Sequence, residues 1–379
     1  MKKAMMLASV ASMIDQFNIP NIELLQSLNY QVDVVADFTH PGTITVARAN
    51  LVKQRLEEKG VRVFDVAIPR SVRIGAIRKA YRKVKTLMDN ENYDLVHCHS
   101  PIGSVVARLA ARKKRKTGTK VIYTAHGFHF YKGVSIKNWM LFYPIEKWLS
   151  RYTDVLITIN KEDYRRAEKK FKAKKTVYVP GIGIDTASFG KNPRGNEIRS
   201  KLGLSDEATI LLSVGELNDN KNHEVVIRAL PRLERQAYYV IVGRGPKEEY
   251  LKKLAEELGV GEFVRLVGFQ SEVRAFYSAA DIFVFPSFRE GLSAALMEAM
   301  ASGLPVACSQ IRGNVDLIDE QGGSFFSPTD VDSVVQALNT VMNSNLEAMS
   351  RHNLDAIKAF DRGVVEKDML AIYSSCTSE

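Results

Sequence analysis

Residues 280–310 read ADIFVFPSFREGLSAALMEAMASGLPVACSQ, and this segment indicates the architecture of the whole chain. The apolar run 282–285 predicts a buried parallel strand, which the following proline ends. A loop over 287–291 then leads into a helix with alanine, leucine and methionine on one face. Gly303 ends this helix, and the run 304–308 predicts the next strand. Strand, helix and strand in this order are typical of a parallel α/β sheet.

The loop before the helix is expected at the edge of the sheet where ligands bind. In open α/β sheets, ligands occupy the crevice outside the carboxyl ends of the strands. The backbone N–H groups of Gly291, Leu292 and Ser293 would point outward from the helix N-terminus. Such amides favour a phosphate group, so this loop is a candidate phosphate site.

Two glutamates accompany this loop. Glu290 lies at its end, and Glu298 follows about two helical turns later. A carboxylate at either position can accept hydrogen bonds from sugar or ribose hydroxyls. Glutamates at this spacing also arise by chance in a chain with 43 acidic residues, so two solvated side chains on a surface helix are the simple alternative.

Length and composition describe a globular protein of two domains. The chain has 379 residues, of which 45% are hydrophobic and 25% are charged. Its longest apolar runs have the length of strands, so no transmembrane helix is expected. The first residues resemble a signal peptide in their two lysines, but the apolar part is short and Asp15 follows, so we expect a strand there. Three cysteines without disulfide or metal spacing suit a reducing compartment.

Charge is distributed unevenly. Residues 1–180 hold 33 Lys and Arg against 15 Asp and Glu, whereas residues 181–379 hold 20 against 28. The basic half suggests an anionic partner, a phospholipid surface or nucleic acid, and solvated surface charge is the third interpretation. Residues 74–88 predict a basic amphipathic helix, which can lie on a membrane or simply cover a sheet. The basic residues lack aromatic interleaving and a recognisable module, which disfavours nucleic acid.

Apolar runs alternate with helical patterns along the chain, which predicts α/β domains with doubly wound parallel sheets. Strands are expected over 4–11, 31–36, 61–64, 94–97, 120–124, 155–159, 176–179, 209–214, 238–242, 263–267, 282–285 and 304–308. A glycine-rich segment over 180–190 is the expected linker. We therefore assign 1–185 to an N-terminal domain and 186–360 to a C-terminal domain, with a helix over about 361–379 returning to the first.

Four histidines lie at the ends of two of the expected strands. They are His97, His99, His126 and His129. Two His-X-His patterns could suggest a metal, but no carboxylate or cysteine completes a site at a suitable spacing, so no metal is expected. His126 is the stronger candidate for chemistry, because it begins a glycine-containing loop directly after a strand.

Segment 280–310 as a whole resembles the donor-sugar motif, a glutamate, seven residues and a second glutamate, of the family-4 retaining glycosyltransferases of the GT-B fold (the group 1 glycosyltransferases of capsule and exopolysaccharide synthesis). The sequence Thr-Ala-His-Gly at 124–127 is similar to the family loop whose histidine lies beside the transferred sugar. Lys221 matches the family lysine at the donor diphosphate. The usual arginine is replaced by Glu216, which leaves the second cationic contact open.

Other residues are placed by the same resemblance. Arg244 or Arg289 could supply the missing cation, and Gly268 and Phe269 match the place where the family holds the nucleotide base. The loop after the first strand departs from the family, which often has paired glycines there. It contains Ser12 and Asp15 instead, and with His99 these are candidate acceptor-side residues.

The resemblance implies two Rossmann-like domains facing a deep interdomain cleft. It also implies an enzyme that transfers a hexosyl or N-acetylhexosaminyl group from a nucleotide-diphosphate sugar, expected to be UDP-linked. The acceptor would be a glycan or a polyprenyl-diphosphate-linked glycan in bacterial capsule, exopolysaccharide or related surface glycan synthesis. The enzyme would be cytoplasmic, and its basic first domain would hold it on the inner face of the cell membrane.

The roles that follow require no metal or other cofactor. Lys221 and helix N-terminal amides would stabilise the leaving diphosphate. Glu290 would orient sugar hydroxyls, Glu298 would hold the ribose, and His126 would lie near the reacting carbon. A sugar-nucleotide epimerase of similar fold and a non-catalytic sugar-nucleotide-binding protein remain as alternatives.

Overall fold

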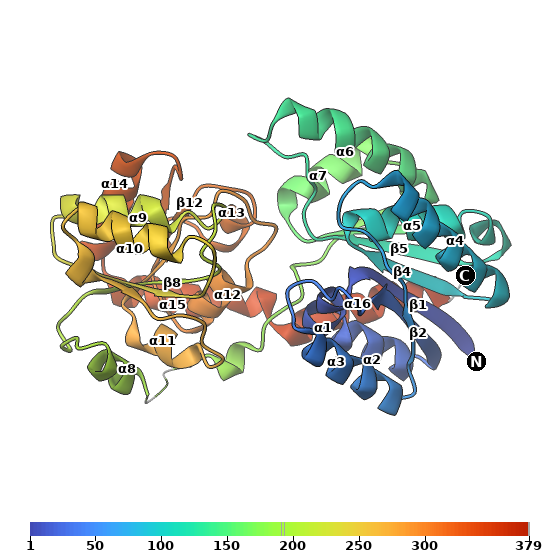
Figure 1. Ribbon diagram of the computed structural model, residues 1–379, viewed down its shortest axis with the longest axis horizontal. Helices are drawn as coiled ribbons and strands as arrows, with labels where there is room; N and C mark the ends of the chain where they lie inside the picture. The colour runs from blue at the N-terminus through green and yellow to red at the C-terminus, as the bar shows by residue number, and fades with distance from the viewer. Residues whose placement is uncertain (191, 193, 378–379) are drawn as a thin grey trace. The chain divides into compact units, whose positions relative to one another are not determined.

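The computed structural model describes residues 1–190, 192 and 194–377. The last two residues of the helix expected over 361–379 lie outside this part of the chain. The described chain forms two compact units (Figure 1). The first comprises Met1–Ile182 with the residues from Gly363 onward, and the second comprises Gly183–Arg362. The divisions fall between Ile182 and Gly183 and between Arg362 and Gly363, whereas the sequence-based boundaries lie after 185 and after 360.

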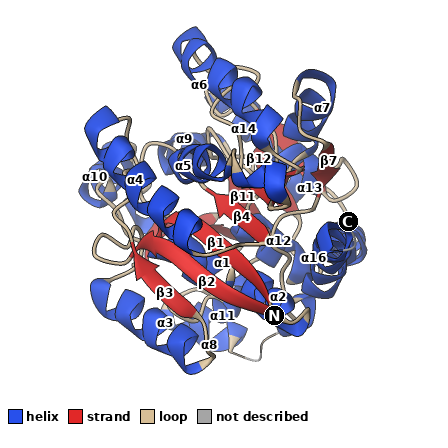
Figure 2. Ribbon diagram, turned by 90° about the vertical axis from the view of Figure 1, so that its right-hand side faces the viewer, coloured by secondary structure: helices blue, strands red, loops and turns tan. Residues whose placement is uncertain are grey.

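The first unit contains a seven-stranded parallel sheet in the order β3-β2-β1-β4-β5-β6-β7. Its strands are β1 Lys2–Val10, β2 Tyr30–Asp37, β3 Arg62–Asp65, β4 Leu95–His99, β5 Lys120–Ala125, β6 Val155–Thr158 and β7 Lys175–Tyr178. Its helices are α1 Ala11–Phe17, α2 Ile19–Ser27, α3 Val46–Glu58, α4 Ile74–Asn90, α5 Pro101–Ala111, α6 Ile136–Leu149, α7 Lys161–Lys170 and α16 Arg362–Thr377. Figure 2 shows these strands between layers of helices.

The second unit contains a six-stranded parallel sheet in the order β10-β9-β8-β11-β12-β13. Its strands are β8 Ile210–Val214, β9 Tyr238–Val242, β10 Val264–Leu266, β11 Ile282–Phe285, β12 Val306–Ser309 and β13 Gly323–Phe326. Its helices are α8 Gly195–Lys201, α9 His223–Ala229, α10 Glu248–Glu257, α11 Arg274–Ala279, α12 Ala294–Ala301, α13 Asn314–Leu317, α14 Val331–Met342 and α15 Leu346–Ala356. The predicted doubly wound parallel sheet in each half is confirmed.

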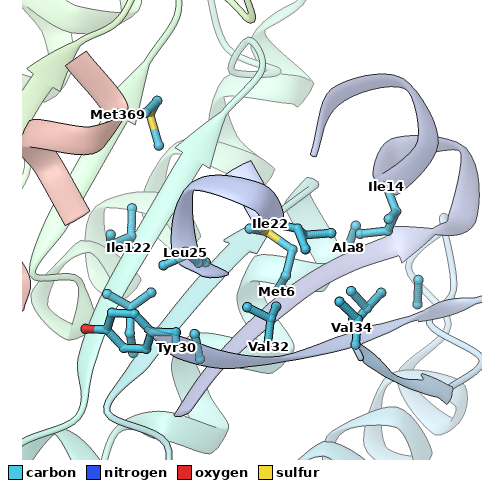
Figure 3. Close-up of a cluster of buried hydrophobic side chains, with 14 of the residues drawn as sticks. Met6, Ala8, Ile14, Ile22, Leu25, Tyr30, Val32, Val34, Ile122 and Met369 are labelled. Atoms are coloured by element: carbon cyan, nitrogen blue, oxygen red, sulfur yellow. The ribbon is translucent and has the colours of Figure 1, made fainter. Parts of the chain in front are cut away.

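Both faces of the first sheet are covered, as its continuous apolar strands require. Helices α1, α2, α3 and α16 pack on one face, and α4, α5 and α7 pack on the other. Figure 3 shows the first of these cores, where Met6 and Ile122 of the sheet lie with Leu25 of α2 and Met369 of α16. The helix that follows the second unit in the chain thus belongs to the core of the first unit.

The basic helix expected over 74–88 is α4, and it covers the sheet. Its side chains Ala80, Val84 and Met88 are buried against the first unit. Its exposed outer residues include the basic side chains Arg78, Lys79, Arg82 and Lys83. Among the helices that the structure describes, none has the length and apolar character that crossing a membrane requires.

One sequence expectation is wrong, and one strand was missed. The segment after β1, expected as a loop through Ser12 and Asp15, is the helix α1, because burial of Ile14 stabilises a turn that has no side-chain cap at its start. The strand β13 was not predicted: its short sequence extends the sheet because it pairs with β12, from Val306↔Gly323 to Ser309↔Phe326.

Candidate functional site

The sheet order locates the donor-side residues in the second unit. Strands β8 and β11 are neighbours, and the order of connection reverses between them. Ligands of doubly wound sheets bind beyond the carboxyl ends of strands at such a point. The loop after β8 carries Lys221, and the loop after β11 carries Glu290. The sequence therefore brings both candidates to the ligand-binding edge of one sheet.

Lys221 and Glu290 form an ion pair. The Lys221 Nζ donates to Glu290 Oε1 at 2.7 Å, and the two side chains are only 20% and 15% exposed. The ammonium also lies 4.7 Å from the centroid of the Phe285 ring, at the end of β11. The lysine stem passes Gly215, where an added Cβ would lie 3.3 Å from Lys221 Cδ. The pair is thus held between the two strand ends in partly dehydrated surroundings.

Hydrogen bonds between the two loops fix the backbone around this pair. The Phe288 N–H donates to the Asn220 carbonyl at 2.8 Å, and Asn220 Nδ2 donates to the Arg289 carbonyl at 3.0 Å. Asn222, in the left-handed region with φ 53°, donates to the Pro286 carbonyl at 3.2 Å. From the next strand end, Arg312 Nε donates to the Glu290 carbonyl at 3.2 Å. The two candidate side chains therefore lie on a backbone that is already fixed by hydrogen bonds.

Glu298 has a partner that the sequence did not suggest. The Tyr277 hydroxyl of α11 lies 2.9 Å from Glu298 Oε2 and also 3.1 Å from the Ala295 carbonyl. Burial raises the pKa of the Glu298 carboxyl, while the Tyr277 hydrogen bond acts in the opposite direction. Tyr277 thus fixes one of the two carboxylate oxygens of Glu298.

The helix beside this site begins later than predicted. Helix α12 starts at Ala294, and Ser293 is its N-cap, with its Oγ accepting from the Leu296 N–H at 3.4 Å. Gly291 and Leu292 therefore precede the helix, so the expectation that their amides belong to its N-terminus is wrong. A serine hydroxyl at the cap satisfies a first-turn amide, which explains the shift.

The loops after β9 and β10 bring Arg244 and Gly268 together. A Cβ added to Gly268 would lie 3.6 Å from Arg244 Nε, and the Gly243 N–H donates to the Gly268 carbonyl at 2.9 Å. Phe269 is 66% exposed beside them. The guanidinium of Arg244 is exposed and makes no ion pair with the described residues, and the same holds for Arg289. Both can still receive an anionic ligand.

Glu216, which stands where the family has an arginine, is also exposed. Its Oε2 accepts a hydrogen bond from Asn218 Nδ2 at 2.9 Å. The Glu216 carboxylate is thus engaged in a hydrogen bond within the loop after β8.

In the first unit, three histidines form a connected group at the carboxyl ends of two neighbouring strands: His97 and His99 belong to β4, and His126 directly follows β5. His99 Nδ1 lies 3.1 Å from His126 Nε2, and the rings of His97 and His99 are 4.2 Å apart. His97 hydrogen bonds Thr124 Oγ1 and the Tyr373 hydroxyl, each at 2.8 Å. Among the described residues, no group of three His, Cys, Asp or Glu side chains is arranged to hold a metal ion.

Burial keeps these imidazoles neutral. It lowers the pKa of His126 to about 4 and that of His97 to about 3, and it lowers the pKa of His99 well below its ordinary value. His126 is closely surrounded by protein, but the residue is not fully buried. His126 can therefore contact a ligand as an uncharged group at neutral pH.

His126 lines a cavity of about 650 Å³ that lies wholly within the first unit. The cavity is also lined by Ser9, Ser12, Met13, Gln16, Arg70, Val72, Ser100, His129 and Phe142. Ser12 is thus placed with His126. Asp15 is not part of the lining, because its carboxylate holds Arg48 through two hydrogen bonds of 2.8 and 2.9 Å. His99 lies behind His126, in the wall of a second cavity of about 30 Å³.

Two doubly wound units with these residues at their strand ends define a glycosyltransferase of GT-B type. The family described as "Glycosyltransferase Family 4" matches residues 22–188, and the family described as "Glycosyl transferases group 1" matches residues 195–358. EpsD of Bacillus subtilis (strain 168), named as a glycosyltransferase, is 37% identical over 330 residues, covering 86% of this chain and 83% of that protein. The chain belongs to this glycosyltransferase family, as its resemblance predicted.

Two further similarities extend over most of the chain. The UDP-Gal:alpha-D-GlcNAc-diphosphoundecaprenol alpha-1,3-galactosyltransferase of Escherichia coli is 27% identical over 360 residues, covering 91% of this chain and 89% of that protein. The crystal structure of Anabaena Alr3699/HepE in complex with UDP and glucose matches with a TM-score of 0.77 and 18% identity, covering 99% of this chain and 100% of that one. The second similarity concerns the fold alone.

Proposed function

We propose that this glycosyltransferase uses a UDP-linked sugar, retains the configuration of the transferred sugar, and glycosylates a polyprenyl-diphosphate-linked glycan in the synthesis of a capsule or exopolysaccharide. The observation that carries the proposal is the Lys221–Glu290 pair beyond β8 and β11. The Escherichia coli relative carries a name that specifies a diphosphoundecaprenol-linked acceptor. The Escherichia coli name also specifies a UDP-linked donor.

The ion pair gives each partner a role that begins when donor binds. Lys221 exchanges Glu290 for the diphosphate, so its ammonium lies where negative charge develops as the bond to the sugar breaks. The released Glu290 carboxylate accepts hydrogen bonds from sugar hydroxyls. The exposed guanidinium of Arg244 or Arg289 adds the second cationic contact in place of the residue that Glu216 replaces. No metal or other cofactor takes part in this scheme.

Glu298 and His126 complete the proposed roles. Glu298, held by Tyr277, accepts from the ribose hydroxyls through its remaining oxygen. His126 faces the sugar as a neutral imidazole, so it adds no positive charge beside a carbon that is itself becoming cationic. The bond between the anomeric carbon and the donor phosphate oxygen breaks, and a bond to the acceptor oxygen forms on the same face. The acceptor proton passes to an oxygen of the leaving diphosphate.

A thermal-shift panel tests the donor. UDP, GDP, ADP and their sugar conjugates are added to the wild type and to Lys221→Ala, because a ligand that binds the folded state raises its melting temperature. We expect a shift with UDP compounds that Lys221→Ala reduces. A shift with GDP or ADP compounds alone would refute the UDP assignment.

A product assay tests the reaction. We expect UDP release that depends on a polyprenyl-diphosphate-linked acceptor, with NMR of the product showing the anomeric configuration of the donor. A new UDP-sugar formed without acceptor would indicate an epimerase instead. Inversion at the anomeric carbon would refute the retaining mechanism.

A further inference from the structure

The helix α6 presents an apolar surface to solvent. Eight of its residues are exposed: Ile136, Lys137, Met140, Leu141, Pro144, Ile145, Lys147 and Trp148. Six of them are apolar, two are lysines and none is acidic. Ile136 is 71% exposed and Met140 is 73% exposed. Helices on the surface of soluble proteins usually turn polar side chains outward, and contiguous exposed apolar patches mark interaction sites.

The opposite side of α6 already holds the helix on its unit. Glu146 is buried and accepts from Arg108 of α5 at 2.8 Å. Trp139 and Tyr143 pack against the Phe130 ring, at centroid distances of 5.5 and 5.4 Å. Figures 1 and 2 both show α6 at the periphery of its unit. The apolar outer surface is therefore not needed to dock the helix.

The exposed surface of α6 differs from that of α4 in the same unit. The outer residues of α4 are mainly charged, including Arg78, Lys79 and Arg82, and water solvates them well. The outer residues of α6 would gain free energy by leaving water. Of the two helices, α6 therefore has the outer surface that suits burial in an apolar environment.

An anionic bilayer fits this surface better than a second copy of the chain. Lys137 and Lys147 lie among the apolar residues, and their stems are long enough to place the ammonium groups in a lipid headgroup layer. Trp148 is a residue type that favours the interface between lipid and water. Two copies packed through α6 would bring these lysines together without an acidic partner. The excess of basic residues over 1–180 adds a general attraction to anionic lipid.

The position of α6 connects this surface to the cavity of the first unit. Phe142, on the inner side of the helix, lines the 650 Å³ cavity together with His126 and the 59% exposed Val72. We propose that α6 inserts its outer face into an anionic bilayer and so holds this cavity at the lipid surface. At the lipid surface, the cavity would receive the diphosphate end of a lipid-linked acceptor, and this part of the inference rests on the proposed function. The membrane contact itself does not depend on it.

Trp148 allows a direct test. The chain has two tryptophans, and Trp139 is the inward one, with its indole N–H donating to the Tyr131 carbonyl. Trp139→Phe therefore leaves Trp148 as the reporter. With vesicles of phosphatidylcholine and phosphatidylglycerol, we expect its emission to shift to the blue and to be quenched by lipids brominated near the headgroups. Unchanged emission from folded protein that co-sediments with the vesicles would refute insertion of α6.

Paired variants test how much the apolar side chains of α6 contribute to vesicle binding. Ile136→Ser with Met140→Ser should weaken vesicle binding by about tenfold or more, because each side chain loses much of the free energy of transfer into lipid. The matched control is Val46→Ser with Leu51→Ser on α3, which removes two exposed apolar side chains of the same unit and should leave binding unchanged. Circular dichroism confirms folding of each variant.

Two results would overturn the proposal. One is equal vesicle binding by the α6 and α3 variants. The other is a concentration-dependent dimer in analytical ultracentrifugation that the α6 variants abolish and the α3 variants do not. Such a dimer would show that a second copy of the chain occupies the outer surface of α6. The shift of melting temperature by UDP, measured without lipid, should be the same in all these variants. A UDP shift without vesicle binding therefore refutes the role of α6 alone, and vesicle binding without any nucleotide shift refutes the donor assignment alone.

Discussion

Replacing Lys221 by methionine should reveal how much the ion pair with Glu290 contributes to stability and to donor binding. Methionine keeps the apolar stem that contacts Gly215 and removes the ammonium, so Glu290 loses its partner in partly dehydrated surroundings. The change affects the folded second unit directly. It also removes the cation that is proposed to receive the diphosphate.

The magnitude follows from the geometry. At 2.7 Å and an effective dielectric constant of about 20, the gross attraction between the two charges is about 6 kcal/mol. Desolvation of both groups offsets most of it. Exposed pairs contribute about 0–1 kcal/mol, whereas removing one partner of a buried pair costs about 3–5 kcal/mol. With side chains 20% and 15% exposed, we expect Lys221→Met to cost about 2 kcal/mol, or about 4–8 °C in the melting temperature of this unit.

A double-mutant cycle measures the pair. The free energy of unfolding is determined in urea for the wild type, Lys221→Met, Glu290→Gln and the double variant, and the coupling should be about 1–2 kcal/mol. The control is Lys252→Met, which removes two ion pairs, with Glu248 and Glu249, from the exposed face of α10 and should leave the melting temperature unchanged. Glu290 is proposed to contact the sugar, which UDP lacks, and it competes with the diphosphate for Lys221. Glu290→Gln should therefore bind UDP at least as tightly as the wild type, while Lys221→Met should bind UDP more weakly. A coupling below about 0.3 kcal/mol, which is within the additivity error of such cycles, would refute the reasoning.

Three ionisable groups in partly or fully buried positions give further predictions. Because burial lowers the pKa of His126 to about 4, the unfolded chain takes up its proton first, and the unfolding free energy falls as the pH drops from about 6.5 towards 4. His126→Gln should reduce this fall in urea titrations, and an unchanged pH profile would contradict it. Glu298→Gln should raise the dissociation constant of UDP by about 10–100-fold in calorimetry; an unchanged constant would exclude the ribose role. Arg108→Leu should cost about 3–5 kcal/mol of unfolding free energy by leaving Glu146 buried and unpaired, and Arg108→Leu with Glu146→Leu should recover most of it.

The fold could be predicted from the sequence where a local signal and the tertiary structure agree. The run 282–285 is continuously apolar because both faces of its sheet are covered, and Gly303 ends α12 where the chain must turn. The order of strands then brings Lys221 and Glu290 together, since both follow strands that meet at the reversal point. Parallel α/β sheets make this inference possible without any knowledge of side-chain packing.

Other features depend on packing that no local pattern records. Helix α1 has no capping signal and forms around the burial of Ile14. Tyr277 reaches Glu298 only because α11 and α12 are adjacent in space, 21 residues apart in the chain. In α6, apolar residues occur on all sides, so the sequence does not reveal which of them are covered. Trp148 is one that remains exposed.

The return of α16 to the first unit has a consequence for how the chain is made. A ribosome completes residues 1–182 before the second unit, yet the first unit still lacks Val365, Met369 and Tyr373, which belong to its core. During synthesis of the second unit, α16 is not yet available to pack on the first sheet, and the hydrogen bond between His97 and the Tyr373 hydroxyl cannot form. The second unit, whose residues are contiguous, can fold at once. The half of the protein that is translated first can therefore complete its core only after the second half has been synthesised.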